Sequence, residues 1–135
     1  MSKFKNTGIL VLGHGSKLPY NKEVVEYVAE KIKEKNIVVR TAYLNMDRPS
    51  VQEGLDSFKG TDVDKIVALP VFLAHGVHTL EDIPEMLGVS KDTNKATIML
   101  DGSKVELIYA EPLGAHEWIA DLAYRRAEEA VNPKE

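Results

Sequence analysis

Two histidines in this sequence stand in glycine-containing turns directly after apolar runs. His14 lies between two glycines in LVLGHGS, and His78 follows an apolar run and a glycine in LPVFLAHGVHT. Neutral imidazoles that converge on one crevice bind borderline divalent ions such as Co²⁺, Ni²⁺ or Zn²⁺, and they accept protons near pH 7. The chain contains no cysteine, so a metal must be held by histidine nitrogen or by oxygen. His14 and His78 are therefore the candidate metal ligands and proton acceptors.

Other polar residues near these turns leave alternatives open. The glycines and the helix start after GHGS also favour an anion such as phosphate, although the stretch lacks both G-x-G-x-x-G and the Lys-Ser/Thr ending of a P-loop. His75 is either a polar cap on its strand or part of a pocket lining. His116 is interpreted as a surface residue. Glu81 is either an auxiliary base or a favourable negative charge in the first turn of a helix.

Composition limits the classes of protein to which this chain belongs. Its 135 residues fit one domain, residues 1–135, and 44% hydrophobic with 28% charged residues is ordinary for a globular protein. The net charge of -4 provides no broad basic surface, so we expect no nucleic-acid partner. No apolar run approaches the roughly 18 residues of a membrane span, so we also expect no membrane partner. The start MSKFKNTG lacks the apolar segment of a signal peptide, so we expect a cytoplasmic location.

Strand and helix patterns alternate four times along the chain. The segment 88–104 has no clear period and is expected to be a long excursion. The alternation predicts an α/β fold with a mostly parallel four-stranded sheet flanked by helices on both faces. His14 and His78 both follow the carboxyl ends of predicted strands, where such sheets bind ligands. The predicted strands are 7–13, 37–44, 64–74 and 105–114, and the predicted helices are 19–35, 50–60, 78–87 and 115–131.

Several local signals refine this prediction. Ser50 is a candidate N-cap, and Pro70 should end the regular pairing of a central strand because it has no N–H to donate. Thr79 and Asp82 have the spacing of a capping box, which predicts a helix that starts just after His78. The last helix is amphipathic, and its predicted inward residues are Trp118, Ile119, Leu122 and Ala123.

Three separated motifs carry a resemblance to a known family. LVLGHGSKLPYNKE near the start, PVFLAHGVHTLEDIPEML in the middle and EPLG near the end resemble, in order and spacing, the small single-domain sirohydrochlorin chelatases of archaea. The similarity covers nearly the whole chain and thins between Gly88 and Lys104. It implies a chelatase-like fold and a lyase that inserts Co²⁺ or Ni²⁺ into sirohydrochlorin, for cobalamin or for the nickel tetrapyrrole coenzyme of methanogenesis. Because two small subunits stand in for the two halves of larger relatives, it also implies a homodimer.

The resemblance also implies roles for individual residues. The family's metal-binding histidines fall on His14 and His78, and a further substrate contact falls on Arg48. The metal ion and sirohydrochlorin are substrates, and no permanently bound cofactor is implied. A metal carrier and a nucleotide- or phosphate-binding α/β domain are the rival functions, and the sequence does not choose between cobalt and nickel. The substrate-contacting loop falls on Leu73, Ala74, His75, Gly76, Val77 and His78.

Overall fold

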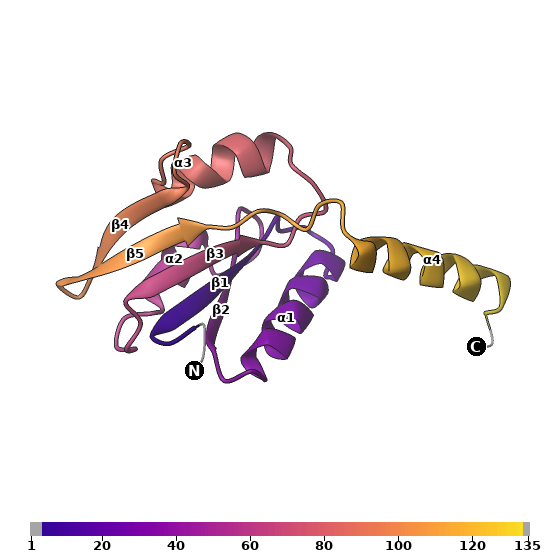
Figure 1. Ribbon diagram of the computed structural model, residues 1–135, viewed down its shortest axis with the longest axis horizontal. Coiled ribbons are helices and arrows are strands. Elements are labelled where there is room, and N and C mark those ends of the chain that lie inside the picture. The colour runs from indigo at the N-terminus through magenta and orange to yellow at the C-terminus, as the bar shows by residue number, and fades with distance from the viewer. Residues whose placement is uncertain (1–3, 134–135) are drawn as a thin grey trace.

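The computed structural model describes residues 4–133 and contains a five-stranded sheet with the strand order β2-β1-β3-β5-β4 (Figure 1). The α/β class predicted from the sequence is confirmed. Strands β1, β2, β3 and β5 pair in parallel, and β4 pairs antiparallel with β5. The strands are β1 (Thr7–Gly13), β2 (Val38–Tyr43), β3 (Lys65–Pro70), β4 (Lys95–Leu100) and β5 (Ser103–Tyr109), and the helices are α1 (Tyr20–Lys33), α2 (Val51–Asp56), the π-helical turn η1 (His78–Asp82), α3 (Ile83–Leu87) and α4 (Glu117–Val131).

Helices cover the two faces of the sheet unequally. Every residue of β1 is buried, which is expected for a parallel strand between two layers. Helix α1 packs on β1 and β2 from one face, around Val11 and Val25. Helices α2 and α3 form the other layer over the larger core, which includes Leu10, Ile66 and Leu107. On β3 the side chains facing α2 and α3 are buried, whereas those on the α1 side are only partly buried.

The sheet has one strand more than the sequence pattern predicted. Residues 88–104 are not simply a long excursion, because they contain β4, which forms a hairpin with β5. Asp101 and Gly102 join the two strands with φ of 50° and 78°, the conformation of a tight hairpin turn. Only one face of β4 packs on the core, and its outward positions, including Lys95 and Met99, are exposed. A strand with one solvated face gives a weak apolar signal, which explains why β4 was not predicted.

The predicted capping box after His78 is wrong. Thr79 and Asp82 do not cap a helix; the chain enters the π-helical turn η1, in which the N–H of Ile83 donates to the carbonyl of His78. The Thr79 hydroxyl is buried and accepts the N–H of Gly76 at 2.9 Å. By contrast, the N-cap predicted at Ser50 is confirmed, and the structure adds a complete capping box with Glu53.

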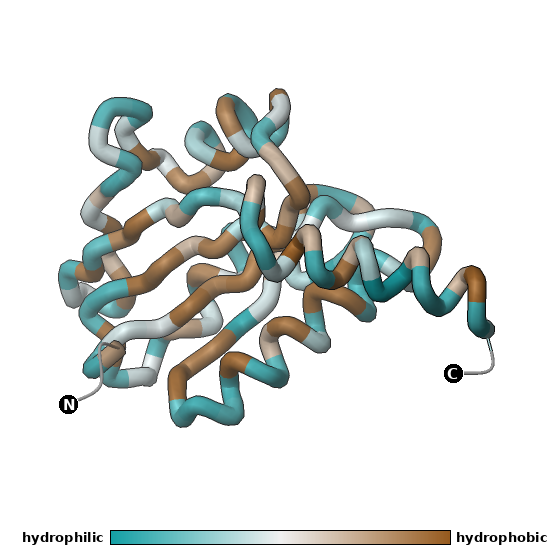
Figure 2. The backbone as a smooth tube through the Cα atoms, turned by 45° about the vertical axis from the view of Figure 1, so that its right-hand side comes forward, coloured by the Kyte–Doolittle hydropathy of each residue, from teal (hydrophilic) through white to brown (hydrophobic). Residues whose placement is uncertain are grey.

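Helix α4 extends beyond the end of the sheet where β1, β3 and β5 finish (Figure 1). The inward packing predicted for its apolar residues is wrong within a single chain, because α4 contains no buried residue. Trp118 is 78% exposed and Leu122 48% exposed. Apolar and polar residues alternate along this helix (Figure 2). None of the helices in residues 4–133 is both long enough and apolar enough to span a membrane.

Candidate metal and tetrapyrrole site

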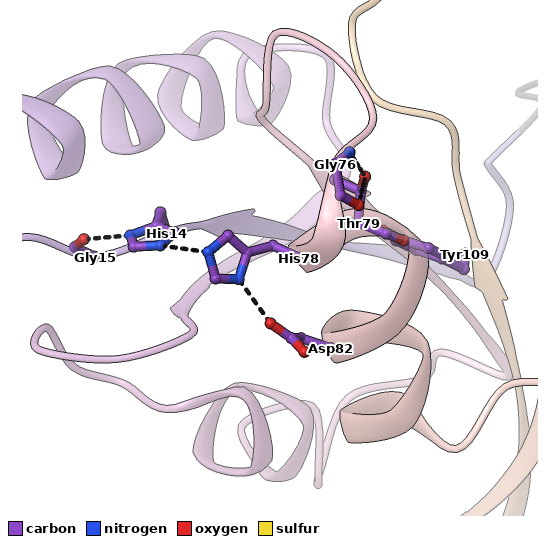
Figure 3. Close-up of polar contacts among 7 residues, drawn as sticks. All are labelled: His14, Gly15, Gly76, His78, Thr79, Asp82 and Tyr109. Atoms are coloured by element: carbon purple, nitrogen blue, oxygen red, sulfur yellow. Dashed lines mark hydrogen bonds and ion pairs between the residues drawn. The ribbon is translucent and has the colours of Figure 1, made fainter.

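The structure brings His14 and His78 together, as the sequence predicted. Their Nε2 atoms are 3.0 Å apart, although 64 residues separate them in the chain (Figure 3). The ring of Phe72 lies near both imidazoles, with its centroid 6.3 Å from that of His14 and 6.5 Å from that of His78. Both imidazoles are partly exposed. The two rings therefore present their Nε2 edges to one another at an accessible point.

Hydrogen bonds at the Nδ1 atoms define which nitrogen of each ring is free. His14 Nδ1 donates to the carbonyl oxygen of Gly15 at 2.9 Å, and His78 Nδ1 donates to Asp82 Oδ2 at 2.7 Å. Each neutral ring then has its lone pair on Nε2, as these partners assign it. Two lone pairs facing each other at 3.0 Å repel unless a proton or a metal cation lies between them. The arrangement is therefore built to hold one positive charge.

The spacing of the two nitrogens suits a divalent metal. With a metal–imidazole bond of about 2.1 Å, atoms 3.0 Å apart subtend about 90° at the ion, the angle between adjacent octahedral ligands. Among the described residues there is no cluster of three or more His, Cys, Asp or Glu side chains that would complete a closed site. Two protein ligands leave coordination positions for water and for a second ligand, which suits an ion that must be handed on.

The glycine turn fixes His14 at the end of β1. Gly15 has φ of +89°, and a Cβ there would overlap the carbonyl oxygen of Asn45. The N–H of Gly15 donates to Asn21 Oδ1 on α1 at 3.0 Å, and the N–H of Asn45 donates to the carbonyl of His14 at 3.3 Å. The loop after β2 therefore closes against the turn, and only glycine allows this approach.

The π-helical turn positions His78 and Asp82. These residues are four apart, and the turn directs both side chains to the same side (Figure 3). The turn is anchored from β5, because the Tyr109 hydroxyl donates to the carbonyl of Thr79 at 2.8 Å. Burial raises the pKa of Tyr109 to about 12, with a smaller contribution from the nearby Glu111 carboxylate, so the phenol remains a donor at neutral pH. π-Helical turns occur often at functional sites.

His75 lies in a separate cluster and does not join the histidine pair. Its Nε2 donates to Glu111 Oε2 at 2.7 Å, and its Nδ1 lies 3.0 Å from the Thr79 hydroxyl. Nε2 thus connects the loop before η1 with the segment after β5, and Nδ1 connects the same loop with η1. A hollow of about 250 Å³ next to this cluster is lined in part by Leu80 and Tyr109. It is smaller than the roughly 300 Å³ at which small-molecule pockets begin.

The remaining residues of the predicted substrate loop lie at the surface. Leu73 is 67% and Val77 65% exposed, and Ala74 is also exposed. A Cβ at Gly76 would meet no atom within 4 Å. This loop precedes His78 directly in the chain, and we call its exposed side chains Leu73 and Val77 the apolar rim. Exposed apolar side chains that gather at one place often mark a binding surface, which favours a ligand contact here.

Arg48 is held by an ion pair outside the histidine pair. Its guanidinium contacts the carboxylate of Glu53 at the surface, and Glu53 also accepts the N–H of Ser50. The hydrogen bond and charge of Glu53 raise the pKa of Arg48, and those of Arg48 lower the pKa of Glu53. Arg48 therefore already binds an anionic group. A substrate carboxylate would have to bind Arg48 together with Glu53 or in place of it.

Asp82 and Glu111 were not predicted as site residues. The sequence pattern places Asp82 in a helix cap. Its spacing of four residues from His78 nevertheless indicates that the two side chains can lie on the same face of a helix. Glu111 belongs to the EPLG motif, but nothing local to that motif indicates that its carboxylate reaches His75. The contact between Glu111 and His75 joins residues that are 36 apart in the sequence, so it forms only when β3 and β5 are paired.

A family model described as CbiX matches residues 8–130 of this chain. The chain belongs to the CbiX family. It is 48% identical over 126 residues to the sirohydrochlorin cobaltochelatase of Methanococcoides burtonii, with 92% of this chain and 96% of that protein covered. The sirohydrochlorin cobaltochelatase of Methanosarcina barkeri is 49% identical over the same coverage.

Solved structures of CbiX and related proteins share the fold. A protein described as CbiX from Marinobacter aquaeolei VT8 superposes with a TM-score of 0.67 at 26% identity, covering 96% of this chain and 99% of that one. The sirohydrochlorin chelatase SirB from Bacillus subtilis subspecies spizizenii, solved with cobalt, has a TM-score of 0.72 at 20% identity. This chain covers 50% of SirB, so one CbiX chain corresponds in fold to half of that molecule.

Proposed function

We propose that this CbiX family member inserts Co²⁺ into sirohydrochlorin. The observation that carries the proposal is the pair of Nε2 atoms, 3.0 Å apart, whose Nδ1 partners leave both lone pairs free for a cation. The relatives that cover most of this chain at 48% and 49% identity are cobaltochelatases of the same substrate, which supports the assignment.

The pair first serves as the metal ligand. Co²⁺ binds to the Nε2 atoms of His14 and His78, while Gly15 and Asp82 keep the Nδ1 atoms protonated and the rings oriented. A hydrogen-bonded carboxylate behind a metal-binding imidazole raises its basicity. Because the two rings fill only adjacent coordination positions, tetrapyrrole nitrogens can approach the ion from the open side.

The same two nitrogens then serve as proton acceptors. Insertion of a divalent ion into a free-base tetrapyrrole releases two pyrrole protons. As each Co–imidazole bond breaks, one Nε2 lone pair of His14 or His78 becomes free, so the pair can accept one proton between its two nitrogens and pass the other to solvent. Loss of these protons to solvent returns the pair to a state that can bind the next ion.

The macrocycle and its eight carboxylates need different contacts. We propose that Leu73 and Val77 lie against the flat ring, with Ala74, His75 and Gly76 supplying the remainder of the loop surface. The net charge of -4 opposes an anionic substrate, so the carboxylates must be bound by local donors. Arg48 and backbone N–H groups near the glycines are the proposed donors, and Arg48 would exchange Glu53 for a substrate carboxylate.

An absorbance titration with sirohydrochlorin tests the proposal. The protein should accelerate insertion of Co²⁺ over the uncatalysed rate at the same metal and tetrapyrrole concentrations. A metal carrier would bind Co²⁺ without acceleration, and a nucleotide- or phosphate-binding domain would not form a complex with sirohydrochlorin. We also propose that Ni²⁺ is accepted, because imidazole serves both ions; parallel assays with Ni²⁺ give the preference.

We further propose that the working form is a cytoplasmic homodimer. The histidine pair and the apolar rim of Leu73 and Val77 lie at the surface of one copy, which leaves a large tetrapyrrole bounded on one side only. The superposition on half of SirB supports a second copy in the place of the other half. Sedimentation at assay concentration measures the oligomeric state, and full activity of a monomer would contradict the proposal.

A further inference from the structure

The EPLG segment, residues 111–114, follows β5 and lies beside the substrate loop that begins at Leu73. Its first residue, Glu111, contacts the loop with its side chain, because the Oε2 atom accepts the Nε2–H of His75 at 2.7 Å. The backbone N–H of Gly114, the last residue of the segment, donates to the carbonyl of Leu73 at 2.8 Å. Both ends of the EPLG segment therefore contact the loop that is proposed to carry the macrocycle.

The contact with Glu111 assigns the proton on the ring of His75. An ionised carboxylate only accepts hydrogen bonds, so Nε2 of His75 is the donor and Nδ1 keeps its lone pair. Nδ1 then accepts the hydroxyl of Thr79 at 3.0 Å, a shorter contact than the 3.2 Å from this hydroxyl to the carbonyl of Gly76. The same hydroxyl accepts the N–H of Gly76 at 2.9 Å. Hydrogen bonds thus run in one direction from Gly76 through Thr79 and His75 to Glu111.

This direction of the hydrogen bonds defines what His75 does in the loop. Both of its ring nitrogens already have partners within the chain, so the imidazole orients the loop and does not bind a substrate carboxylate itself. Its partner Thr79 is buried and follows the metal ligand His78 directly in the chain. The loop is therefore held at Glu111 on one side and at the buried start of η1 on the other.

The contact between Glu111 and His75 is too exposed to contribute much to folding. The side chain of Glu111 is 75% exposed and that of His75 is 43% exposed, and pairs of this kind at a surface add little to stability. The contact can nevertheless restrict the loop, because a Cβ at Gly76 would meet no atom within 4 Å and the backbone there has open space around it. A loop that is ordered before its ligand arrives loses less freedom on binding.

We infer that Glu111 is a positioning residue for tetrapyrrole binding and that it acts through His75. Glu111 holds the imidazole, the imidazole holds the hydroxyl of Thr79, and the loop between these contacts presents the apolar rim to the flat ring. The inference rests on the proposed function, because it assigns Glu111 to the binding of the same substrate. It also gives the EPLG motif a role that the histidine pair does not explain.

The inference separates the effects on the two substrates. His78 has an anchor of its own, since its Nδ1 donates to Asp82 Oδ2 at 2.7 Å, and Tyr109 holds the carbonyl of Thr79 at 2.8 Å. Loss of the Glu111 contact should therefore weaken the binding of sirohydrochlorin and leave the affinity for Co²⁺ nearly unchanged. A general distortion of the site would instead lower both affinities together.

Two replacements of Glu111 isolate its hydrogen bond from its charge. Glu111→Ala and Glu111→Gln both lose the charge, but the amide oxygen of glutamine can still accept the Nε2–H of His75. Glu111→Ala should raise KM for sirohydrochlorin about 3- to 10-fold, with kcat and the Kd for Co²⁺ nearly unchanged, and Glu111→Gln should restore most of the binding. Equal KM values for the two variants would overturn the inference, and so would a parallel loss of Co²⁺ affinity in Glu111→Ala.

Glu106→Ala is the matched control for the loss of a carboxylate near β5. Glu106 lies on β5 and pairs at 3.8 Å with Lys65, the first residue of β3, whereas His75 follows the other end of that strand. Its KM for sirohydrochlorin should equal that of wild type. Equal increases of KM in Glu106→Ala and Glu111→Ala would show an effect of net charge and would overturn the inference.

A double-variant cycle tests whether Glu111 acts through His75. His75→Ala should itself raise KM for sirohydrochlorin, because the loop loses its contact with Thr79. The variant His75→Ala/Glu111→Ala should then show the same KM as His75→Ala alone, since the partner of Glu111 is already absent. Additive effects of the two replacements would contradict a role through the imidazole.

A measurement without metal or tetrapyrrole separates this inference from the chelatase assay. Long-range ¹H–¹⁵N NMR of the wild-type protein should show His75 with its proton on Nε2, and Glu111→Ala should show a mixture of the two ring forms. Failure of the proposed function would appear as the absence of a sirohydrochlorin complex with wild type, whatever the ring form. Wild-type His75 with its proton on Nδ1 would overturn the role of Glu111 even if the chelatase assay succeeded.

Discussion

The Nε2 atoms of His14 and His78 lie at hydrogen-bonding distance, while the Nδ1 atom of each ring donates to an oxygen of its own loop or helix. Both rings are thereby oriented before any ion arrives. His14 is held by backbone and His78 by a carboxylate, so the two ligands are not equivalent electrostatically.

Replacement of either histidine should remove insertion without unfolding the protein. His14→Ala and His78→Ala each leave one nitrogen ligand, and we expect Co²⁺ insertion to fall at least 100-fold relative to wild type. Both side chains are partly exposed, so the thermal transition should change little. Stopped-flow or steady-state absorbance with sirohydrochlorin measures the rate.

His116→Asn is the control for general loss of histidine. Asn is a good N-cap, so α4 should remain capped in place of the His116 Nδ1 bond. Near-normal turnover is expected. If His14→Ala also retained near-normal turnover, the assignment of the metal ligands would be wrong.

Asp82 should matter for metal affinity although it does not face the ion. Asp82→Asn removes the charge that accepts the His78 Nδ1–H, and loss of such a partner behind a metal-binding imidazole costs about 10- to 100-fold in metal affinity. Isothermal titration with Co²⁺ in the absence of tetrapyrrole measures it. Glu81→Gln, one residue earlier in η1, is the matched control and should bind Co²⁺ normally. An unchanged affinity of Asp82→Asn would remove the carboxylate from the site.

The α/β architecture was predictable because its signals are local or periodic. β1 is a short apolar run bounded by glycines, and Ser50 forms the predicted N-cap of α2. The pairing of His14 with His78 followed from both residues standing at the carboxyl ends of parallel strands. These features depend on the chain's own pattern and on general sheet geometry, which a single sequence contains.

The incorrect predictions concern local structure that tertiary contacts determine. Thr79 and Asp82 have capping-box spacing, but the Thr79 hydroxyl binds Gly76 and the Asp82 carboxylate binds His78. β4 was missed because its outward residues are polar or exposed. The apolar pattern of α4 was recognised correctly, but none of its residues is buried within the single chain. A sequence shows that an apolar helix face needs a partner surface, but it does not show which molecule provides that surface.

Gly15 should be intolerant of alanine for two separable reasons. Its φ of +89° is strained for an L-residue, and a Cβ there would overlap the Asn45 carbonyl. Gly60 has a similar φ of +84° but no atom within 4 Å of the added Cβ. Gly60→Ala therefore measures strain alone, expected at about 1 kcal/mol. Gly15→Ala should cost clearly more, about 2 to 4 kcal/mol.

Urea unfolding of the two glycine variants gives the comparison, and Co²⁺ insertion gives a second readout. Gly15→Ala should also impair insertion, because the turn holds His14 Nδ1 against the Gly15 carbonyl. Gly60→Ala lies in a loop far from this contact and should insert Co²⁺ normally. Equal stability losses in the two variants would show that the loop after β2 gives way and that the close approach is not needed.

Alkaline pH should destabilise the fold through Tyr109. Burial, assisted by the Glu111 carboxylate, raises its pKa to about 12 in the folded protein, whereas an unfolded tyrosine ionises near ~10. The folded state therefore binds the phenolic proton more tightly. This stabilisation is fully present below pH ~10 and is lost progressively as the pH rises from there to about 12. The total is on the order of 2 kcal/mol.

The variant Tyr109→Phe isolates this contribution. It removes the hydrogen bond to the Thr79 carbonyl, so it should be less stable than wild type by about 1 kcal/mol at neutral pH. Its free energy of unfolding should then fall less steeply than that of wild type above pH ~10. Part of the slope should remain, because burial also raises the pKa of Tyr43 to about 12. Identical slopes for wild type and Tyr109→Phe in urea titrations would mean that the Tyr109 phenol ionises as easily in the folded protein as in the unfolded one.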